Sequence, residues 1–158
     1  MTLLSIEHIS RSVETGFIRK QKKEILHDIS FCVGKRETVG ITGASGAGKS
    51  TLARVIMGLL REDGGNIVFQ GKELTKTSLR EARRRRRQMH MLFQNPASSL
   101  NPRMKIRESM EELARIYGMD ISHGKEIHEM MKRLQLREEL LHRYPHQLSG
   151  GELQRVCL

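Results

Sequence analysis

Short apolar runs separated by polar and glycine-rich stretches fill the chain up to residue 95. They predict strands at Leu3 to Ile9, Ile25 to Val33, Glu37 to Thr42, Asn66 to Phe69 and Gln88 to Phe93. Between the third and fourth runs, apolar residues recur at helical spacing, which predicts a helix that begins at Ser50 and ends in a turn at Gly64-Gly65. The apolar face of this helix consists of Leu52, Val55, Ile56, Leu59 and Leu60.

A second pattern lies between Pro102 and Pro145, where the sequence contains no proline. Apolar positions repeat there at helical spacing in two sets: Ile106, Met110, Leu113 and Tyr117, then Ile127, Met130, Met131 and Leu134. We expect a helical sub-domain over residues 103–147 that follows a β-rich part over residues 1–95. An ordinary helical hairpin is the plainer alternative, and the methionines are expected to serve as core residues.

At 158 residues the chain has the size of one domain, and its apolar runs are far shorter than the ~18 residues of a membrane span. We find no secretory signal at the N-terminus, which favours a cytoplasmic location. Cys32 and Cys157 lack metal-ligand spacing, so neither a disulfide nor structural zinc is expected. The formal net charge of +10 favours anionic partners, while 4% aromatic residues argue against single-stranded nucleic acid as the ligand.

Residues 39–51 carry the most specific pattern, VGITGASGAGKST, which matches G-x-x-x-x-G-K-[ST] from Gly43 to Ser50. With a predicted strand before it and a helix after it, this pattern is typical of a phosphate-binding loop, because backbone N–H groups and the helix N-terminus face one anion. Lys49 is expected to reach the β- and γ-phosphates, Ser50 to coordinate Mg²⁺ and Thr51 to help hold the α-phosphate side. The predicted nucleotide-binding residues are Gly43, Ala44, Ser45, Gly46, Ala47, Gly48, Lys49, Ser50 and Thr51.

A second motif, LSGGELQR at residues 148–155, resembles the signature sequence of ATP-binding cassette (ABC) proteins. On chemical grounds Ser149, Gly150 and Gly151 offer a hydroxyl and backbone donors to an anion. Ser149 and Glu152 also form an S-x-x-E capping box, a purely structural alternative. Gln94 follows the predicted strand that ends at Phe93, where the glutamine loop of the family belongs.

The stretch FQNPASSLNPR at residues 93–103 resembles the ATPases of dipeptide, oligopeptide and nickel importers, and the sequence from Gln147 to Leu158 resembles the nickel importer ATPases most. The resemblance implies an α/β fold: a P-loop NTPase (RecA-like) ABC ATPase core, an antiparallel β sub-domain and an inserted helical sub-domain. The chain is then a partial nucleotide-binding domain over residues 1–158, incomplete at its C-terminus, in which the signature motif and the start of the following helix occupy residues 148–158.

The resemblance also implies the ligands and partners. ATP and Mg²⁺ are the cofactors, with Gln94 and Lys49 in catalytic roles and with Ser50 and Gln94 near the Mg²⁺ ion. Ser149, Gly150, Gly151 and Glu152 would cover the ATP of a second cassette, identical or related, in a head-to-tail pair. Transmembrane permease subunits and an extracytoplasmic substrate-binding protein complete such systems, at the inner face of the cell membrane. No nucleic-acid partner is expected.

The sequence departs from the family pattern in two ways. Counterparts of the Walker B aspartate, the catalytic glutamate and the switch histidine are missing, so we expect these 158 residues to bind nucleotide weakly and to hydrolyse it negligibly. Val13 is at the position nearest to the usual adenine-stacking aromatic residue, with Phe17 close by. Three alternatives to a nickel importer ATPase stay open: a peptide importer ATPase, a nucleotide-binding remnant without hydrolysis, and an ABC ATPase that acts on nucleic acid.

Two charged features invite other interpretations. Arg83 to Arg87 are five consecutive arginines, which we interpret as a solvated face, with attraction to anionic lipid as the main alternative. Two histidine pairs lack the helical geometry in which residues i and i+4 can share a metal ion. His142 and His146 are separated by Pro145, and His123 and His128 are five residues apart, so no transition-metal site is predicted.

Overall fold

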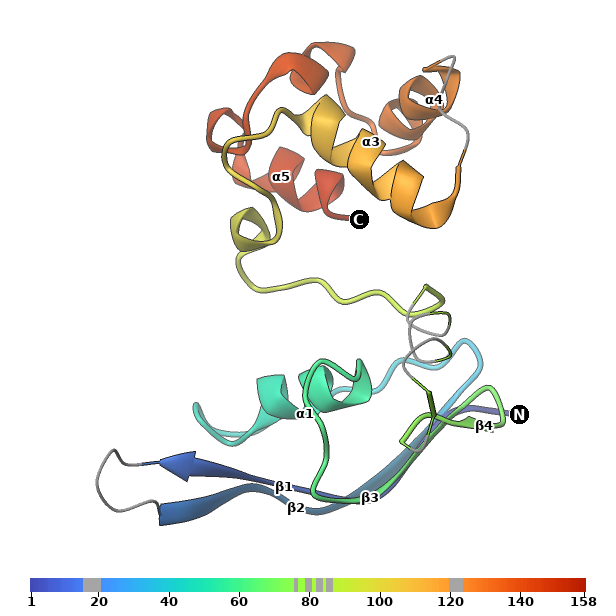
Figure 1. Ribbon diagram of the computed structural model, residues 1–158, viewed down its shortest axis with the longest axis vertical. Helices are drawn as coiled ribbons and strands as arrows, with labels where there is room; N and C mark the ends of the chain where they lie inside the picture. Colours follow the sequence, from blue (N-terminus) through green and yellow to red (C-terminus); the bar gives the residue numbers. More distant parts are fainter. Residues whose placement is uncertain (16–20, 76, 79–80, 82–83, 85–86, 120–123) are drawn as a thin grey trace. The chain divides into compact units, whose positions relative to one another are not determined.

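The computed structural model describes residues 1–15, 21–75, 77–78, 81, 84, 87–119 and 124–158. The chain divides into two compact units, an N-terminal unit, Met1–His90, and a C-terminal unit, Met91–Leu158 (Figure 1). Among the described helices, none has the length and apolar character that a bilayer span requires.

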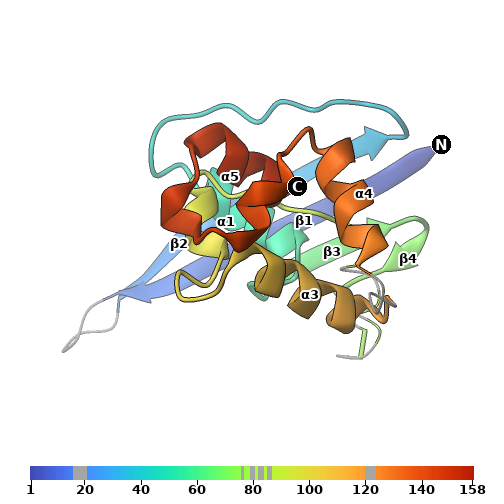
Figure 2. The same ribbon diagram turned by 90° about the horizontal axis from the view of Figure 1, so that it is seen from above.

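The N-terminal unit contains an antiparallel sheet with the strand order β2-β1-β3-β4. Its strands are β1 (Thr2–Thr15), β2 (Gln21–Gly34), β3 (Gly64–Phe69) and β4 (Lys72–Glu73). β1 lies between β2 and β3, with Leu4 opposite both Val33 and Phe69 (Figure 2). Three of the predicted strands are thereby confirmed, and β1 and β2 extend well beyond their predicted ends.

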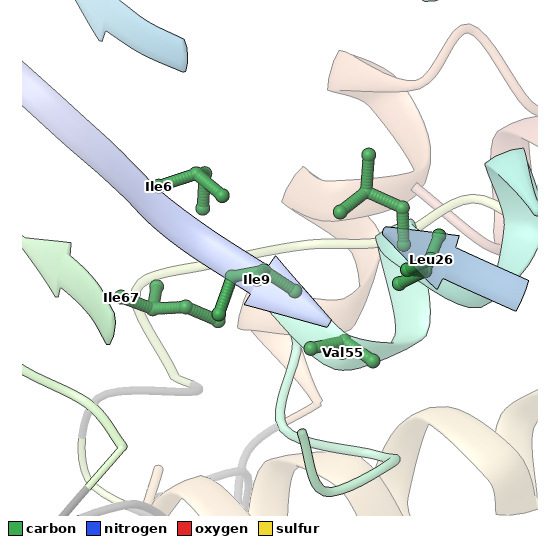
Figure 3. Close-up of a cluster of buried hydrophobic side chains, with 6 residues drawn as sticks. Ile6, Ile9, Leu26, Val55 and Ile67 are labelled. Atoms are coloured by element: carbon green, nitrogen blue, oxygen red, sulfur yellow. The ribbon is translucent and has the colours of Figure 1, made fainter. Parts of the chain in front are cut away.

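Helix α1 (Lys49–Ile56) covers one face of this sheet (Figure 1). The buried side chains between helix and sheet are Ile6, Ile9, Leu26, Leu52, Val55 and Ile67 (Figure 3). Leu52 and Val55 lie on one side of α1, as the helical spacing predicts, and β1 supplies Ile6 and Ile9 to the same core. The core therefore fixes the start of α1 against the sheet.

Two predicted strands are wrong. The segments 37–42 and 88–93 are in no strand of the described sheet. Four of their apolar side chains are exposed: Val39 is 40% and Ile41 47% exposed, and Leu92 is 43% and Phe93 37% exposed. A strand needs a neighbour to pair its N–H and C=O groups, and no strand in the described part of the chain pairs with either segment.

The helix after the glycine-rich loop is shorter than predicted. It ends at Ile56 because Gly58 adopts a left-handed conformation with φ 63°, and the amides of Leu59 and Leu60 turn back to the carbonyl of Arg54. Gly64 and Gly65 do not form its terminal turn. They begin β3, where a Cβ at Gly65 would collide with the backbone of Glu7 and His8 on β1.

The C-terminal unit is helical. Its elements are η1 (Pro96–Ser99), α3 (Ile106–Tyr117), α4 (Lys125–Arg133), η2 (Glu138–His142), η3 (Pro145–Gln147) and α5 (Gly150–Val156). They enclose a second core made of Ile106, Ile127, Met131, Leu136, Leu140 and Leu141. Helices α3 and α4 confirm the two predicted helical repeats. Met131 is fully buried, as expected of a core methionine, whereas Met130 is 37% exposed, so the expectation of a core methionine is wrong at Met130.

The predicted apolar face of α3 is only half correct. Ile106 is fully buried and Met110 packs against the core, whereas Leu113 is 53% and Tyr117 42% exposed. Ala114 is the buried residue in the second half of this helix. The buried stripe of α3 therefore runs through Ile106, Met110 and Ala114, at i, i+4 and i+8, and leaves Leu113 and Tyr117 at the surface.

Candidate functional site

The glycine-rich loop of residues 43–48 connects an extended segment to α1 and is largely exposed. Gly46 and Gly48 have φ angles of 82° and 89°, in the left-handed region that glycine tolerates best. A Cβ at Gly48 would lie 2.8 Å from the backbone oxygen of Ile25 on β2. Gly48 therefore allows the start of α1 to lie directly on the sheet, which holds one end of the loop.

Lys49 lies at the first position of α1 and folds back over the loop. Its Nζ donates to the carbonyl oxygens of Gly43 and Ala44, at 2.7 and 2.8 Å. The first N–H groups of α1 have no acceptor within the helix, and Gly48 offers no side chain to cap them. A lysine ammonium beside these N–H groups is the donor set that fits a phosphate chain.

Ser50 and Thr51 occupy the first turn of α1. Ser50 is exposed and Thr51 is half-buried. A serine hydroxyl next to a phosphate site is a typical oxygen ligand for Mg²⁺. Among the described residues, no three His, Cys, Asp or Glu side chains gather as a metal site.

Gln94 lies in the C-terminal unit, in an exposed bend directly before η1. The Asn95 side chain caps η1 by accepting from the backbone N–H of Ala97 at 3.2 Å. η1 in turn contacts α5, where the Cys157 thiol donates to the Pro96 carbonyl at 3.5 Å. The segment after Gln94 is thus packed against α5, the helix that begins within the signature motif.

Ser149 is the N-cap of α5 and forms the capping box expected from the sequence. The Ser149 N–H and hydroxyl both donate to Oε2 of Glu152, at 2.9 and 2.7 Å, and the Glu152 N–H donates to Ser149 Oγ at 3.4 Å. Gly150 and Gly151 are exposed, and a Cβ at Gly150 would meet no atom within 4 Å. The motif therefore presents an open stretch of backbone to solvent, while the Ser149 hydroxyl is hydrogen-bonded to Glu152.

Arg137, which no sequence motif includes, lies beside the signature motif. Its Nη2 lies 3.9 Å from Oε1 of Glu152. The N–H and hydroxyl of Ser149 lower the pKa of Glu152, and the charges of Arg137 and Arg143 lower it further, so the carboxyl is ionised at neutral pH. No sequence spacing could have revealed this contact, because Arg137 and Glu152 belong to different elements and meet only in the folded chain.

Several predicted residues are not brought into a site. The expected strand before the phosphate-binding loop is absent, as described above, and Val13 lies half-buried on β1 opposite Lys23. Phe17 and most of the arginine run lie outside the described residues, while Arg84 and Arg87 are exposed. His128 pairs with Glu138 at 2.9 Å, and His146 stacks on Tyr144. The phosphate-binding loop is in one unit, and Gln94 and the signature motif are in the other.

Comparisons with known proteins agree with these motifs. The chain is 38% identical to the oligopeptide transport ATP-binding protein OppF of Haemophilus influenzae, over 98% of the chain and 49% of OppF. It is 36% identical to the nickel import ATP-binding protein NikE of Brucella suis, over 100% of the chain and 61% of NikE. The chain therefore spans about half to three fifths of the length of these relatives.

Among solved structures, the chain resembles the ATP-binding cassette MJ0796, solved as a dimer in a post-hydrolysis state bound to ADP and Pi. The two sequences are 25% identical. The structures match with a TM-score of 0.78 over 98% of the chain and 66% of MJ0796, so the fold is that of an ATP-binding cassette. The family model described as ABC transporter matches residues 26–158. This match includes the phosphate-binding loop, Gln94 and the signature motif, and it shows that the chain belongs to the ABC transporter family.

Proposed function

We propose that the chain forms part of the ATP-binding subunit of an ABC importer. The observation that carries this proposal is the loop of residues 43–48, in which Lys49 Nζ lies within 2.8 Å of two loop carbonyls next to the uncapped start of α1. A phosphate that enters this loop replaces the carbonyls as acceptor for the lysine donors. The importer function is supported by the relatives named for nickel and oligopeptide import.

In this proposal residues 43–51 hold the phosphates of ATP, and Lys49 compensates their charge. Ser50 would supply an oxygen to Mg²⁺, and Gln94 would contact Mg²⁺ or the attacking water. Mg²⁺, when bound, neutralises charge on the phosphates during transfer. Because counterparts of the Walker B aspartate, catalytic glutamate and switch histidine are missing from these 158 residues, we expect them to hydrolyse ATP negligibly.

We further propose that the signature residues act on a second cassette. Ser149, Gly150, Gly151 and Glu152 would face ATP held by the phosphate-binding loop of an identical or related partner. The dimeric structure of MJ0796 supports pairing as a property of a similar cassette. In the full system the pair would bind permease subunits at the inner face of the membrane. An extracytoplasmic binding protein would deliver the substrate to these permease subunits.

The proposed cargo is nickel or another transition-metal complex, with dipeptides or oligopeptides as the alternative. The relatives include both kinds of importer at similar identity. Uptake of labelled nickel and labelled dipeptide by cells that lack the corresponding gene separates the two. Loss of nickel uptake alone supports the proposal, and loss of dipeptide uptake alone supports the alternative.

MgATP titration tests the nucleotide site. Lys49→Ala removes the ammonium group that donates to two loop carbonyls, so the affinity of the variant for MgATP is expected to fall about tenfold or more. Lys72→Ala, which removes an exposed lysine on β4, is the matched control and should bind like the unmodified chain. Equal affinities of the Lys49→Ala and unmodified chains would refute the assignment.

A further inference from the structure

The N-terminal unit has a pocket of about 110 Å³ beside the end of β3, which we call the β4 pocket. This volume holds a group the size of several water molecules, such as one phosphate. Apart from Phe69, which is buried, the described lining side chains are exposed, so a ligand can enter from solvent. The lining residues are Phe69, Gln70, Lys72, Glu81, Arg84 and Gln88, and none of these six belongs to the phosphate-binding loop.

The turn between β3 and β4 fixes one wall of the β4 pocket. It consists of Gln70 and Gly71, whose φ angles are 51° and 74°. Positive φ at both residues is typical of the type I′ turn that joins two antiparallel strands. The turn places Lys72 opposite Phe69, and the Gln70 N–H donates to the Leu3 carbonyl at 2.8 Å. The sheet therefore holds Gln70 and Lys72 in position.

The donors of the β4 pocket fit phosphate oxygens. Arg84 presents a planar guanidinium, which can donate to two oxygens of one phosphate at once. Lys72 adds an ammonium from β4, and the side-chain amides of Gln70 and Gln88 add neutral donors. Two cations from separate segments of the chain thus line the same small pocket.

Glu81 limits which phosphate the pocket accepts. Lys72 and Arg84 carry two positive charges and Glu81 one negative charge, so the described lining has a net charge of +1. This charge balances a phosphodiester, which is singly charged, better than a doubly charged phosphate monoester. Phospholipid headgroups and nucleic acids are the common carriers of phosphodiesters.

The sequence around Arg84 favours lipid. Arg84 belongs to the run from Arg83 to Arg87, and about four to eight cationic residues in one short segment are typical of attachment to anionic lipid. The low aromatic content of the chain, 4%, argues against single-stranded nucleic acid. A merely solvated arginine run would not explain why Lys72 of β4 lines the same pocket as Arg84.

We propose that the β4 pocket binds the phosphodiester of an anionic phospholipid headgroup, with Arg84 and Lys72 as the cations that hold it. The choice of lipid as the carrier rests on the proposed function, which places the chain at the inner face of the membrane. The pocket is a second anion site and takes no part in nucleotide binding.

The test is sedimentation of the full chain with phosphatidylcholine vesicles that contain or lack phosphatidylglycerol. We expect binding to the phosphatidylglycerol vesicles only, and Arg84→Gln and Lys72→Ala should each weaken it about fivefold. The matched controls are Arg61→Gln and Lys35→Ala, which remove exposed cations of the same unit outside the pocket lining. Each control should change the affinity less than about twofold.

Lys72 is the decisive position, because it lies outside the arginine run. If Lys72→Ala binds the vesicles like Lys35→Ala, the run attracts lipid without the pocket and the proposal is overturned. Glu81→Gln guards against misfolding, because removal of its charge should tighten binding about two- to threefold, a gain that a misfolded chain would not give. Unchanged or weaker binding of Glu81→Gln would contradict a phosphate beside this carboxylate.

Two further probes identify the carrier of the phosphate. Release of the chain from vesicles by inorganic phosphate, but not by chloride of equal ionic strength, would make free phosphate the ligand and overturn the lipid assignment. Binding to duplex DNA but not to vesicles, with the same losses in Arg84→Gln and Lys72→Ala, would make nucleic acid the partner and overturn it as well.

The pocket and the nucleotide site fail separately. If Lys49→Ala leaves the affinity for MgATP unchanged while Arg84→Gln still weakens vesicle binding, the nucleotide assignment is wrong and the β4 pocket stands. If Lys49→Ala lowers the affinity for MgATP but no vesicle binds the unmodified chain, the β4 pocket proposal alone is overturned.

Discussion

Replacing Gly48 by alanine tests how the phosphate-binding loop is held on the sheet. Gly48 has φ 89°, a conformation that costs an L-residue about 1–2 kcal/mol. The new Cβ would also lie 2.8 Å from the Ile25 backbone oxygen, 3.0 Å from Leu26 Cδ2 and 3.1 Å from Ile25 Cγ2. Because a backbone oxygen cannot rotate away, α1 must move from β2, and such overpacking costs about 1–3 kcal/mol. The expected total loss of unfolding free energy is about 2–5 kcal/mol.

Gly46→Ala is the matched control for this substitution. Gly46 has a similar φ of 82°, but a Cβ there meets no atom within 4 Å. It should therefore pay only the backbone cost of about 1–2 kcal/mol. The difference between the two variants isolates the contact between Gly48 and β2.

Equilibrium urea unfolding followed by far-ultraviolet circular dichroism measures both losses. We expect Gly48→Ala to be less stable than Gly46→Ala by about 1–3 kcal/mol. Losses that agree within about 0.5 kcal/mol would show that the close approach to Ile25 has no energetic weight, and the reasoning would be refuted.

Two further predictions concern the two units separately. Met131→Ala removes a fully buried side chain and should lower the free energy of unfolding, measured in urea, by about 2–5 kcal/mol. Met130 is 37% exposed, so Met130→Ala should lower it by less than about 1 kcal/mol. Equal losses would contradict the described core. Asp63 accepts hydrogen bonds from the Ser12 N–H and from Arg11, and these contacts lower its pKa in the folded state. The ionised carboxylate therefore stabilises the fold at pH values above the unfolded-state pKa. This stabilisation is lost as the pH falls through the lower folded-state pKa. Asp63→Asn should flatten the acid limb of the stability curve, and an unchanged slope would rule out this contribution.

Elements with local signals were predictable from the sequence. The spacing of Leu52 and Val55 identified the buried face of α1, and the capping box of Ser149 and Glu152 has the predicted contacts. The motif from Gly43 to Ser50 was also a local signal, because its glycines and lysine act within one loop.

Elements that depend on distant partners were not predictable. The apolar run from Glu37 to Thr42 has the composition of a strand, but a strand exists only where another strand pairs with it. The contact between Gly48 and Ile25 and the ion pair between Arg137 and Glu152 likewise arise from tertiary packing, which sequence spacing does not encode.

The extended segment 37–42 has a practical consequence for purification. Val39 and Ile41 lie two residues apart and are both exposed, and no strand of the described sheet pairs with the backbone of this segment, so another polypeptide can add to it as a strand. Strand addition between two copies is second order in protein, so its rate quadruples when the concentration doubles. Dilution, or the substitutions Val39→Lys or Ile41→Lys, should therefore slow precipitation of the purified chain.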